Sequence, residues 1–424
     1  MYFKQRVLVV ALAAALPWMG AHAQSNADLL KQIEALKAQL EALTAKVEAV
    51  SRQSGGVNPQ EFNRLVQKVE LAEENSITSG FKGMKFKGVI EAAYLWDKRQ
   101  QKQGFVTTNG HSQDASFPSV GMFEISKEVD DGVSWTLRLS PGNAGLATGG
   151  GLVHEATVAL PLGGGGAKLI AGLMPDWQGY EYYFGHQNPL VTHNLLFAYA
   201  AASTYEGVGT SHTFGKLATK WMWANIDNNR SGKAPGVVYR GDYTVSEYTY
   251  VGFAGAHART QRQFDMVEVD AGYSRGDWIM NGQLTAGRER GIAFNGGDAR
   301  WWGMSALAGY KVTPTLQFLT RFDYISNRHN GGGIYVEGPG FVGLGNTTSG
   351  FGPELDNTGA VVDPNRGANR YALSAGFNYA INANAAWKSE LRLDRSSGFN
   401  FTDVQSGAPK RSNLSVGTSI VVSF

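Results

Sequence analysis

Apolar and polar side chains alternate at every second position through much of the chain from residue 81 to the C-terminus. The segment 413–424 shows this pattern most clearly, because its even-numbered positions are mostly apolar and its odd-numbered positions mostly polar. The even-numbered series is Leu414, Val416, Thr418, Ile420, Val422 and Phe424. Successive side chains of a β-strand point to opposite faces, so we predict that this segment is a strand with one apolar face.

A second predicted strand, near residues 387–394, has ionisable groups along its polar face. Its apolar face carries Trp387, Leu391 and Leu393. Its polar face consists of Lys388, Glu390, Arg392 and Asp394. Charges at four successive positions of one face fit a water-filled lumen better than the interior of a sandwich.

Short turns and long loops alternate between the predicted strands. The short turns lie at 130–132, 163–166, 214–216, 275–277, 312–314 and 382–384. The long loops span 97–117, 141–150, 175–204, 226–236, 290–299, 327–368 and 398–411. About sixteen strands result when 237–244 and 247–257 are counted separately. Membrane barrels have this asymmetry between rims, and their closed sheets satisfy the backbone hydrogen bonds. We therefore predict an all-β transmembrane antiparallel β-barrel at 81–424.

Aromatic residues recur near predicted strand ends or on outward faces, where interfacial girdles of a barrel lie. The residues expected there are Phe86, Tyr94, Trp96, Trp135, Trp278, Trp301, Phe377, Tyr379, Trp387 and Phe424.

Residues 1–23 have the pattern of an export signal. Lys4 and Arg6 precede an apolar run at 7–16, and Ala21 and Ala23 form a small-x-small cleavage pattern. A run of this length is too short to span a bilayer, so we expect cleavage after Ala23.

Residues 24–54 carry a heptad pattern that predicts a short periplasmic coiled coil. Its apolar seam is Leu29, Ile33, Leu36, Leu40, Leu43, Val47 and Val50. Three heptads are marginal alone, so the seam favours self-association, with two or three strands both open. The alternative is a single amphipathic helix that packs on its own domain. Residues 55–80 are interpreted as a linker with a possible short helix.

Composition narrows the functional classes. The 424 residues include 54 glycines and no cysteine, and only 17% are charged. The mean hydropathy of −0.23 argues against a bundle of membrane helices. Without Lys4 and Arg6 the remaining charges balance, so bulk charge does not indicate a nucleic-acid partner.

Two segments resemble a known family. The last strand, which ends in Phe424, is similar to the insertion signal of outer-membrane barrels. The stretches 172–181 and 188–197, followed by Glu206-Gly207-Val208, resemble the third-loop region of OmpL-like β-barrel porins. At 192–194, Thr-His-Asn stands where the family pattern has a Ser-Arg-Ser-like segment. The resemblance implies an outer-membrane diffusion channel whose third loop narrows the lumen. A coiled coil ahead of a barrel also resembles several trimeric porins.

The resemblance also implies a constriction between an acidic loop and a basic wall. The loop side would be Asp176, Tyr180, Glu181, Tyr182, His186 and His193. The wall would be Lys85, Lys87, Arg138, Lys168, Lys220, Arg321, Arg370, Lys388 and Arg392. Inward acids are also expected, so the predicted charge selectivity is weak: Glu91, Glu124, Glu155, Glu268, Asp270, Asp323, Glu390 and Asp394.

Other functional classes receive less support. The spacing of His186 and His193 does not predict a metal site, and neighbouring Ser211 and His212 would point to opposite faces of a strand. We therefore expect no enzymatic activity, cofactor or metal. The expected partners are outer-membrane lipid, lipopolysaccharide, small polar solutes and two further copies in a homotrimer. The competing interpretation is a non-conducting barrel that serves as an anchor or adhesin with long surface loops.

Overall fold

The computed structural model describes residues 83–98, 115–116, 119–129, 132–140, 152–163, 165–201, 204–227, 234–259, 263–333, 352–403 and 406–424. The chain divides into two units, Met1–Lys82 and Gly83–Phe424. The predicted signal segment, coiled coil and linker lie outside the described residues. None of the described helices is long and apolar enough to cross a membrane.

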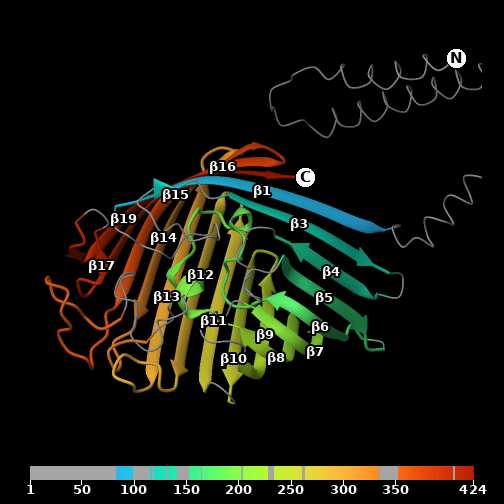
Figure 1. Cartoon of the computed structure of the whole chain (residues 1–424). Coiled ribbons are helices and arrows are strands. Elements are labelled where there is room, and N and C mark those ends of the chain that lie inside the picture. Colours follow the sequence, from blue (N-terminus) through green and yellow to red (C-terminus); the bar gives the residue numbers. More distant parts are fainter. Residues whose placement is uncertain are drawn as a thin grey trace, which may run out of the picture. The chain divides into compact units, whose positions relative to one another are not determined.

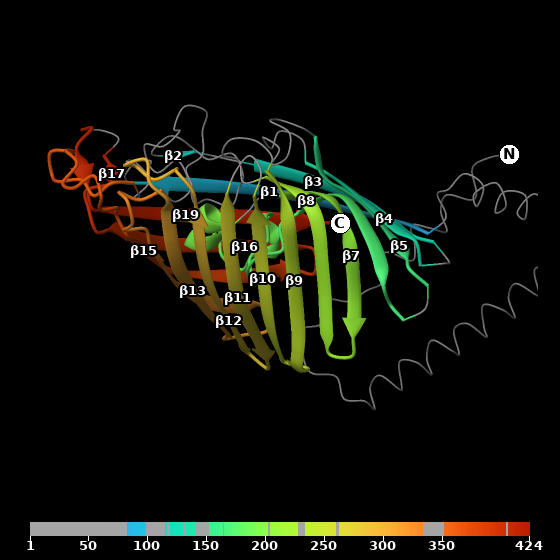
Figure 2. The same cartoon turned by 90° about the horizontal axis from the view of Figure 1, so that it is seen from below.

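Sixteen long antiparallel strands of the described residues form one closed sheet (Figures 1 and 2). They are β1 (Met84–Asp97), β3 (Ser119–Glu128), β4 (Ser134–Leu139), β5 (Val153–Pro161), β6 (Lys168–Pro175), β7 (Thr204–Phe214), β8 (Leu217–Asp227), β9 (Ala234–Ser246), β10 (Thr249–Ala258), β11 (Phe264–Arg275), β12 (Trp278–Glu289), β13 (Ala299–Lys311), β14 (Leu316–Ser326), β15 (Arg370–Asn382), β16 (Ala385–Ser396) and β19 (Ser412–Ser423). The first and last strands pair from Val89 opposite Ser423 to Asp97 opposite Ser415, which closes the barrel. The predicted antiparallel barrel is therefore confirmed.

Three further two-residue strands lie in or beside the loops. They are β2 (Ala115–Ser116), β17 (Phe401–Thr402) and β18 (Pro409–Lys410). The predicted alternation of short turns and long loops is present, with an additional short connection between β10 and β11. Met84 and Phe424 both lie at the rim formed by the short turns.

Alternation along each strand separates an apolar exterior from a polar interior. On β16, Leu391 and Leu393 are exposed, whereas Glu390 and Arg392 are buried. Exposed outward aromatics include Phe86, Trp221, Trp223, Trp278, Trp302, Phe318, Tyr379, Trp387 and Phe424. This is the arrangement of a membrane-spanning barrel. The expectation for Trp301 is wrong, because it lies on the inward face of β13 and is buried.

The third long loop folds into the barrel and contains two short helices (Figure 1). These are η1 (Gly185–Gln187) and α3 (Leu195–Ala200). The side chain of Asn194 caps α3 by accepting a hydrogen bond from the Phe197 amide at 2.7 Å. Leu195 and Leu196 of α3 belong to an apolar cluster with inward side chains such as Met266. The loop thus fills part of the lumen with its own core.

Gly209 of β7 is closely covered by the neighbouring strand. A Cβ at this position would lie 1.9 Å from the carbonyl oxygen of Trp221 and 2.5 Å from the Cα of Met222. Both atoms belong to the backbone, so only a shift of the strand would make room.

We expect Gly209→Ala to destabilise the barrel by about 1–3 kcal/mol, the usual cost of overpacking. The measurement is the temperature at which the folded species, which migrates differently from the heat-denatured chain, is lost on a gel. Gly282→Ala is the matched control, because a Cβ at this strand position meets no atom within 4 Å. Equal losses in the two variants would contradict the steric explanation.

Candidate functional site

Arg321 of β14 anchors the third loop. Its guanidinium donates to Glu181 Oε1 at 2.9 Å, to the Thr192 carbonyl at 2.7 Å and to the His193 carbonyl at 3.0 Å. It also pairs with Asp323 on its own strand at 3.1 Å. The Arg321 side chain is 0% exposed. A single guanidinium therefore joins the barrel wall to two separate parts of the loop.

Two residues of β16 hold the same loop. The Glu390 carboxylate accepts hydrogen bonds from the Thr192 amide at 2.6 Å and the Thr192 hydroxyl at 2.7 Å. Lys388 Nζ donates to the carbonyl oxygens of Gly185 at 2.6 Å and Asn188 at 3.1 Å. These contacts satisfy backbone groups at the tip of the loop, which would otherwise be buried without partners.

Two more arginines of the barrel wall also bind the third loop. Arg392 donates to the His193 carbonyl at 2.6 Å, and Arg370 donates to the Tyr199 hydroxyl at 2.8 Å. Both arginines pair with Asp394, which fixes them on the wall. Such charge-assisted hydrogen bonds are stronger than those between neutral groups.

The beginning of the loop is attached to the neighbouring wall. Arg240 of β9 donates to the Trp177 carbonyl at 2.8 Å, and the Gly179 amide donates to Glu268 of β11. Together with the contacts above, the loop is attached to inward residues of β9, β11, β14, β15 and β16.

The predicted wall residues fall into two groups. Arg321, Arg370, Lys388 and Arg392 lie at inward positions, as the alternation indicates, but the loop covers their side chains. They therefore contact the loop directly instead of facing it across open space.

The remaining predicted cations lie elsewhere. Arg138 and Lys220 border an open cavity. Lys87 is 64% exposed and pairs with Glu124 at 3.0 Å. Lys85 and Lys168 lie close to the short-turn rim, at the beginning of β1 and β6.

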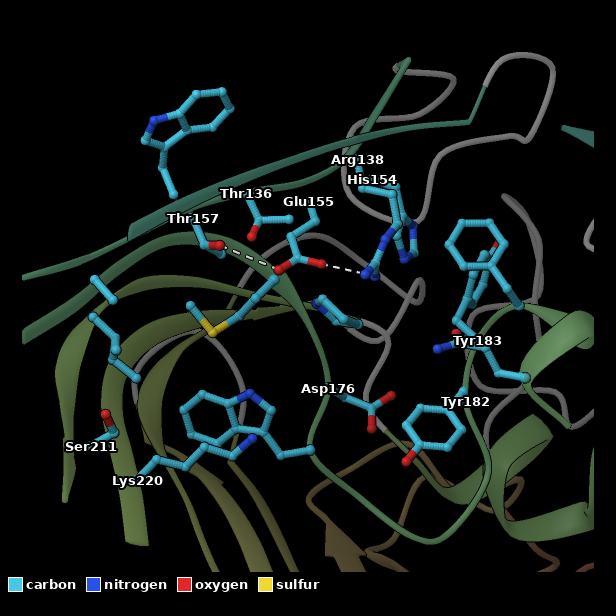
Figure 3. Close-up of a pocket in the computed structure, with 18 of the residues that line it drawn as sticks. Thr136, Arg138, His154, Glu155, Thr157, Asp176, Tyr182, Tyr183, Ser211 and Lys220 are labelled. Atoms are coloured by element: carbon cyan, nitrogen blue, oxygen red, sulfur yellow. Dashed lines mark hydrogen bonds and ion pairs between the residues drawn. The ribbon is translucent and has the colours of Figure 1, made fainter. Parts of the chain in front are cut away.

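A cavity of about 490 Å³ separates the third loop from the wall formed by β4 to β8 (Figure 3). From the loop it is bordered by Asp176, Trp177, Tyr182, Tyr183 and Gln187. From the wall it is bordered by Arg138, His154, Glu155, Thr157, Ser211 and Lys220. This cavity thus lies on the side of the lumen opposite β14 to β16, to which the loop is attached.

Charges of both signs border this cavity. Arg138 lies between Glu124 at 2.6 Å and Glu155 at 2.8 Å. The Lys220 ammonium lies 4.5 Å from the centre of the Trp177 ring, a cation–π contact. Lys220 has no carboxylate at ion-pair distance among the residues that the structure describes. The Lys220 ammonium is therefore a cation at the border of this cavity that no described carboxylate neutralises by direct pairing.

Two further cavities lie on the short-turn side of the loop, with volumes of about 620 Å³ and 400 Å³. The larger is bordered by Tyr180, Tyr182 and Tyr250, among others. The smaller is bordered by Glu124 and Arg138. Gln187 borders all three cavities, so the open spaces meet around the tip of the loop.

The predicted loop residues differ in accessibility. Asp176 and Tyr182 border the first cavity, and Tyr182 is 57% exposed. His186 borders the two cavities on the short-turn side of the loop. Glu181 and His193 are buried in the contact with the wall.

Tyr180 has a structural partner on the wall. Its hydroxyl lies 2.6 Å from Ser305 Oγ, which in turn donates to Asp323 at 2.6 Å.

Apart from Tyr182, the aromatic and neutral residues of the cavity were not predicted from the sequence. Trp177 positions Lys220, and His154 stacks on Tyr183 with ring centres 4.7 Å apart. Gln187 at the tip was not predicted, because a neutral side chain in a loop carries no periodic or charge signal. Among the described residues, no three His, Asp or Glu side chains gather as metal ligands would.

Two buried groups of the loop have pKa values displaced in opposite directions. Burial raises the pKa of Glu181 to about 7, although Arg321 and the Asn194 amide act to lower it. Burial lowers the pKa of His193 to about 3, against a hydrogen bond to the Tyr182 carbonyl. Glu181 therefore binds a proton more readily in the attached loop than in a released one, and His193 less readily.

Acidification from pH 7 to pH 5 is expected to loosen the loop in Glu181→Gln and to tighten it in His193→Gln. A released His193 binds a proton near its ordinary pKa of 6.5, so acid favours release. The attached Glu181 binds its proton near pH 7 and a released one only near 4.5, so acid favours attachment. Open-channel current noise, recorded as a function of pH, measures how often the loop is released. The pH response of the wild type should lie between those of the two variants. Identical pH responses of the two variants would contradict the assignment.

Comparisons with known proteins agree with this architecture. The family model described as “Putative beta-barrel porin-2, OmpL-like” matches residues 83–424. Among solved structures, an anion-selective porin from Comamonas acidovorans is 12% identical, with a TM-score of 0.51 over 80% of this chain and 99% of that chain. OmpT, an outer-membrane protein of Vibrio cholerae, is also 12% identical, with a TM-score of 0.49 over 80% of this chain and 97% of that chain. The search of curated proteins gives no match. The family model spans the whole barrel, and the chain therefore belongs to the OmpL-like β-barrel porin family of the Gram-negative outer membrane.

Proposed function

We propose that this porin is a passive diffusion channel for small hydrophilic solutes and that its third loop narrows the lumen. The observation that carries the proposal is the position of the loop. It is attached to the β9–β16 wall by buried charged groups, and it leaves a polar cavity of about 490 Å³ beside β4 to β8. Solute would pass between Tyr182 and Gln187 on the loop and Arg138, Glu155 and Lys220 on the wall.

Weak charge selectivity is part of the proposal. The cavity has both carboxylates and cations on its border, and Arg138 is neutralised by two glutamates. A lining of this kind orients a dipolar solute without binding it tightly, so the solute can leave. Enzymatic activity and a resident cofactor are not part of the proposed function.

We propose a homotrimer for the assembly. The heptad seam at residues 29–50 supports self-association in the periplasm, and the apolar exterior provides surface for neighbouring barrels and lipid. A trimer form of OmpT from Vibrio cholerae is among the similar structures.

Planar-bilayer recording of the purified full chain tests the function. Discrete current steps in groups of three are expected, together with liposome swelling in small sugars, amino acids and dicarboxylates. Deletion of residues 176–190 should raise the conductance, because these residues separate the cavity from the opposite wall. Unchanged permeability after this deletion would overturn the constriction. Electrical silence of correctly folded protein would favour the non-conducting anchor instead.

A further inference from the structure

The outer face of the barrel carries a basic cluster at the loop end of β10 to β13, strands that lie side by side in Figure 2. Four arginines, Arg259, Arg288, Arg290 and Arg300, are exposed there beside Asp265, and a second carboxylate, Asp298, accepts from the Gly291 amide at 3.3 Å next to Arg290. Register brings Asp265, Arg288 and Arg300 into one row across three strands. We call the four arginines and Asp265 the arginine cluster.

The side chains of this row face outward. Val267 and Leu284 share the face of Asp265 and Arg288, and both are exposed. The inward neighbours Met266 and Glu289 are buried. The arginine cluster therefore lies on the membrane side of the wall and not in the lumen.

The contacts within the cluster leave positive charge uncompensated. Asp265 accepts from Arg259 and pairs with Arg288 at 3.2 Å. It is also bonded to His257 at 2.9 Å, so one carboxylate is shared by three groups. Arg290 contacts the neutral Gln263 at 2.9 Å.

The remaining arginine increases this excess. Arg300 lies directly opposite Arg288 in the pairing of β12 with β13, and the described residues give it no carboxylate. Like charges directly opposite each other on a sheet are destabilising. An anion between the two guanidinium groups would remove this repulsion, and phosphate matches their geometry.

The exposed residues next to the arginine cluster, towards the middle of the barrel, indicate which kind of molecule bears that anionic group. Towards the middle of the barrel the same face continues with Phe253, Val267, Val269, Leu284 and Trp302, all of which are exposed. Long loops of outer-membrane barrels face the cell exterior, so the arginine cluster lies at the headgroup level of the outer leaflet and the apolar residues at acyl-chain level. We propose that this face binds a phosphorylated glycolipid of the outer leaflet, with its phosphate on Arg288 and Arg300 and its acyl chains on the apolar residues below. This inference rests on the orientation in the membrane and does not require that the channel conducts.

The experiment measures lipid binding to the purified full chain, refolded without lipid, in a neutral detergent. The probes are bisphosphorylated lipid A, the same lipid without phosphates, and inorganic phosphate. Bisphosphorylated lipid A should bind at least about tenfold more tightly than either of the others, since only it combines charge-assisted hydrogen bonds with apolar contact. Its binding should also weaken as salt is raised.

The double variant R288Q/R300Q should lose at least about tenfold in affinity for bisphosphorylated lipid A, without a change in single-channel conductance. R275Q is the matched control, because Arg275 is an exposed arginine at the other end of β11. Equal affinity of wild type and double variant, or of the two lipids for the wild type, would overturn the proposal. Equal affinity for inorganic phosphate would overturn the assignment to a lipid. If the double variant does not fold, the comparison of the three probes on the wild type still decides.

Discussion

Replacement of Arg321 by alanine is expected to release the third loop and to raise single-channel conductance by about twofold or more. The buried guanidinium lies within ion-pair distance of Glu181, Asp323 and Glu390. Removal of one partner of a buried ion pair costs about 3–5 kcal/mol, because the other charges remain buried and unpaired. The loop can avoid this cost by leaving the wall, which hydrates the carboxylates and opens the space it occupied.

The measurement compares conductance and open-channel noise of Arg321→Ala with those of the wild type. Arg395→Ala is the matched control, since Arg395 is exposed on the outer face of β16. The double variant R321A/E390Q should regain part of the wild-type behaviour, because it has one unpaired carboxylate fewer. Folded Arg321→Ala with unchanged conductance and noise would show that the loop does not depend on this anchor.

The barrel could be predicted from sequence because its signals are local. A two-residue period decides which face each side chain occupies, and this correctly placed Lys388, Glu390, Arg392 and Asp394 inside. Turn residues and loop lengths are equally local, so the strand count and the asymmetry of the rims followed from them.

Which strands the third loop packs against could not be predicted from such local signals. Arg321 and Glu181 are 140 residues apart, and Lys388 and Gly185 are 203 apart. Alternation shows that these side chains point inward, but it contains no information about which of them meet across the lumen. The predicted acidic loop and basic wall are indeed neighbours, yet their contact is buried. One open cavity lies on the other side of the loop, next to Lys220 and Glu155, and two more lie on its short-turn side.

Helix α3 was missed for a related reason. Six residues without charge, Leu195–Ala200, form a helix too short for a periodic signal. Its stability comes from the Asn194 cap and from burial against inward side chains of distant strands such as Met266 and Trp301. Only the closed barrel provides that surface.

Reversal of the charge at Lys220 is expected to shift the channel towards cations. Among the cations that border the first cavity, Arg138 is paired with two glutamates, whereas Lys220 has only the face of Trp177. Lys220→Glu changes the local charge by two units. In a water-filled passage, a unit charge about 8 Å from an ion contributes about 0.5 kcal/mol, so the substitution amounts to about 1 kcal/mol. A cation gains this free energy and an anion loses it, so the ratio of cation to anion permeability changes by about thirtyfold.

Reversal potentials across a gradient of potassium chloride measure this ratio. Low salt should enlarge the effect, because counter-ions screen the charge less. Lys216→Glu is the matched control: Lys216 lies in the exposed turn between β7 and β8, at the end of the same hairpin, and the substitution is identical in charge. An equal shift in both variants would mean that the potential arises at the mouth of the barrel. A shift confined to Lys220→Glu would place the selective step in the passage between the third loop and the β4–β8 wall.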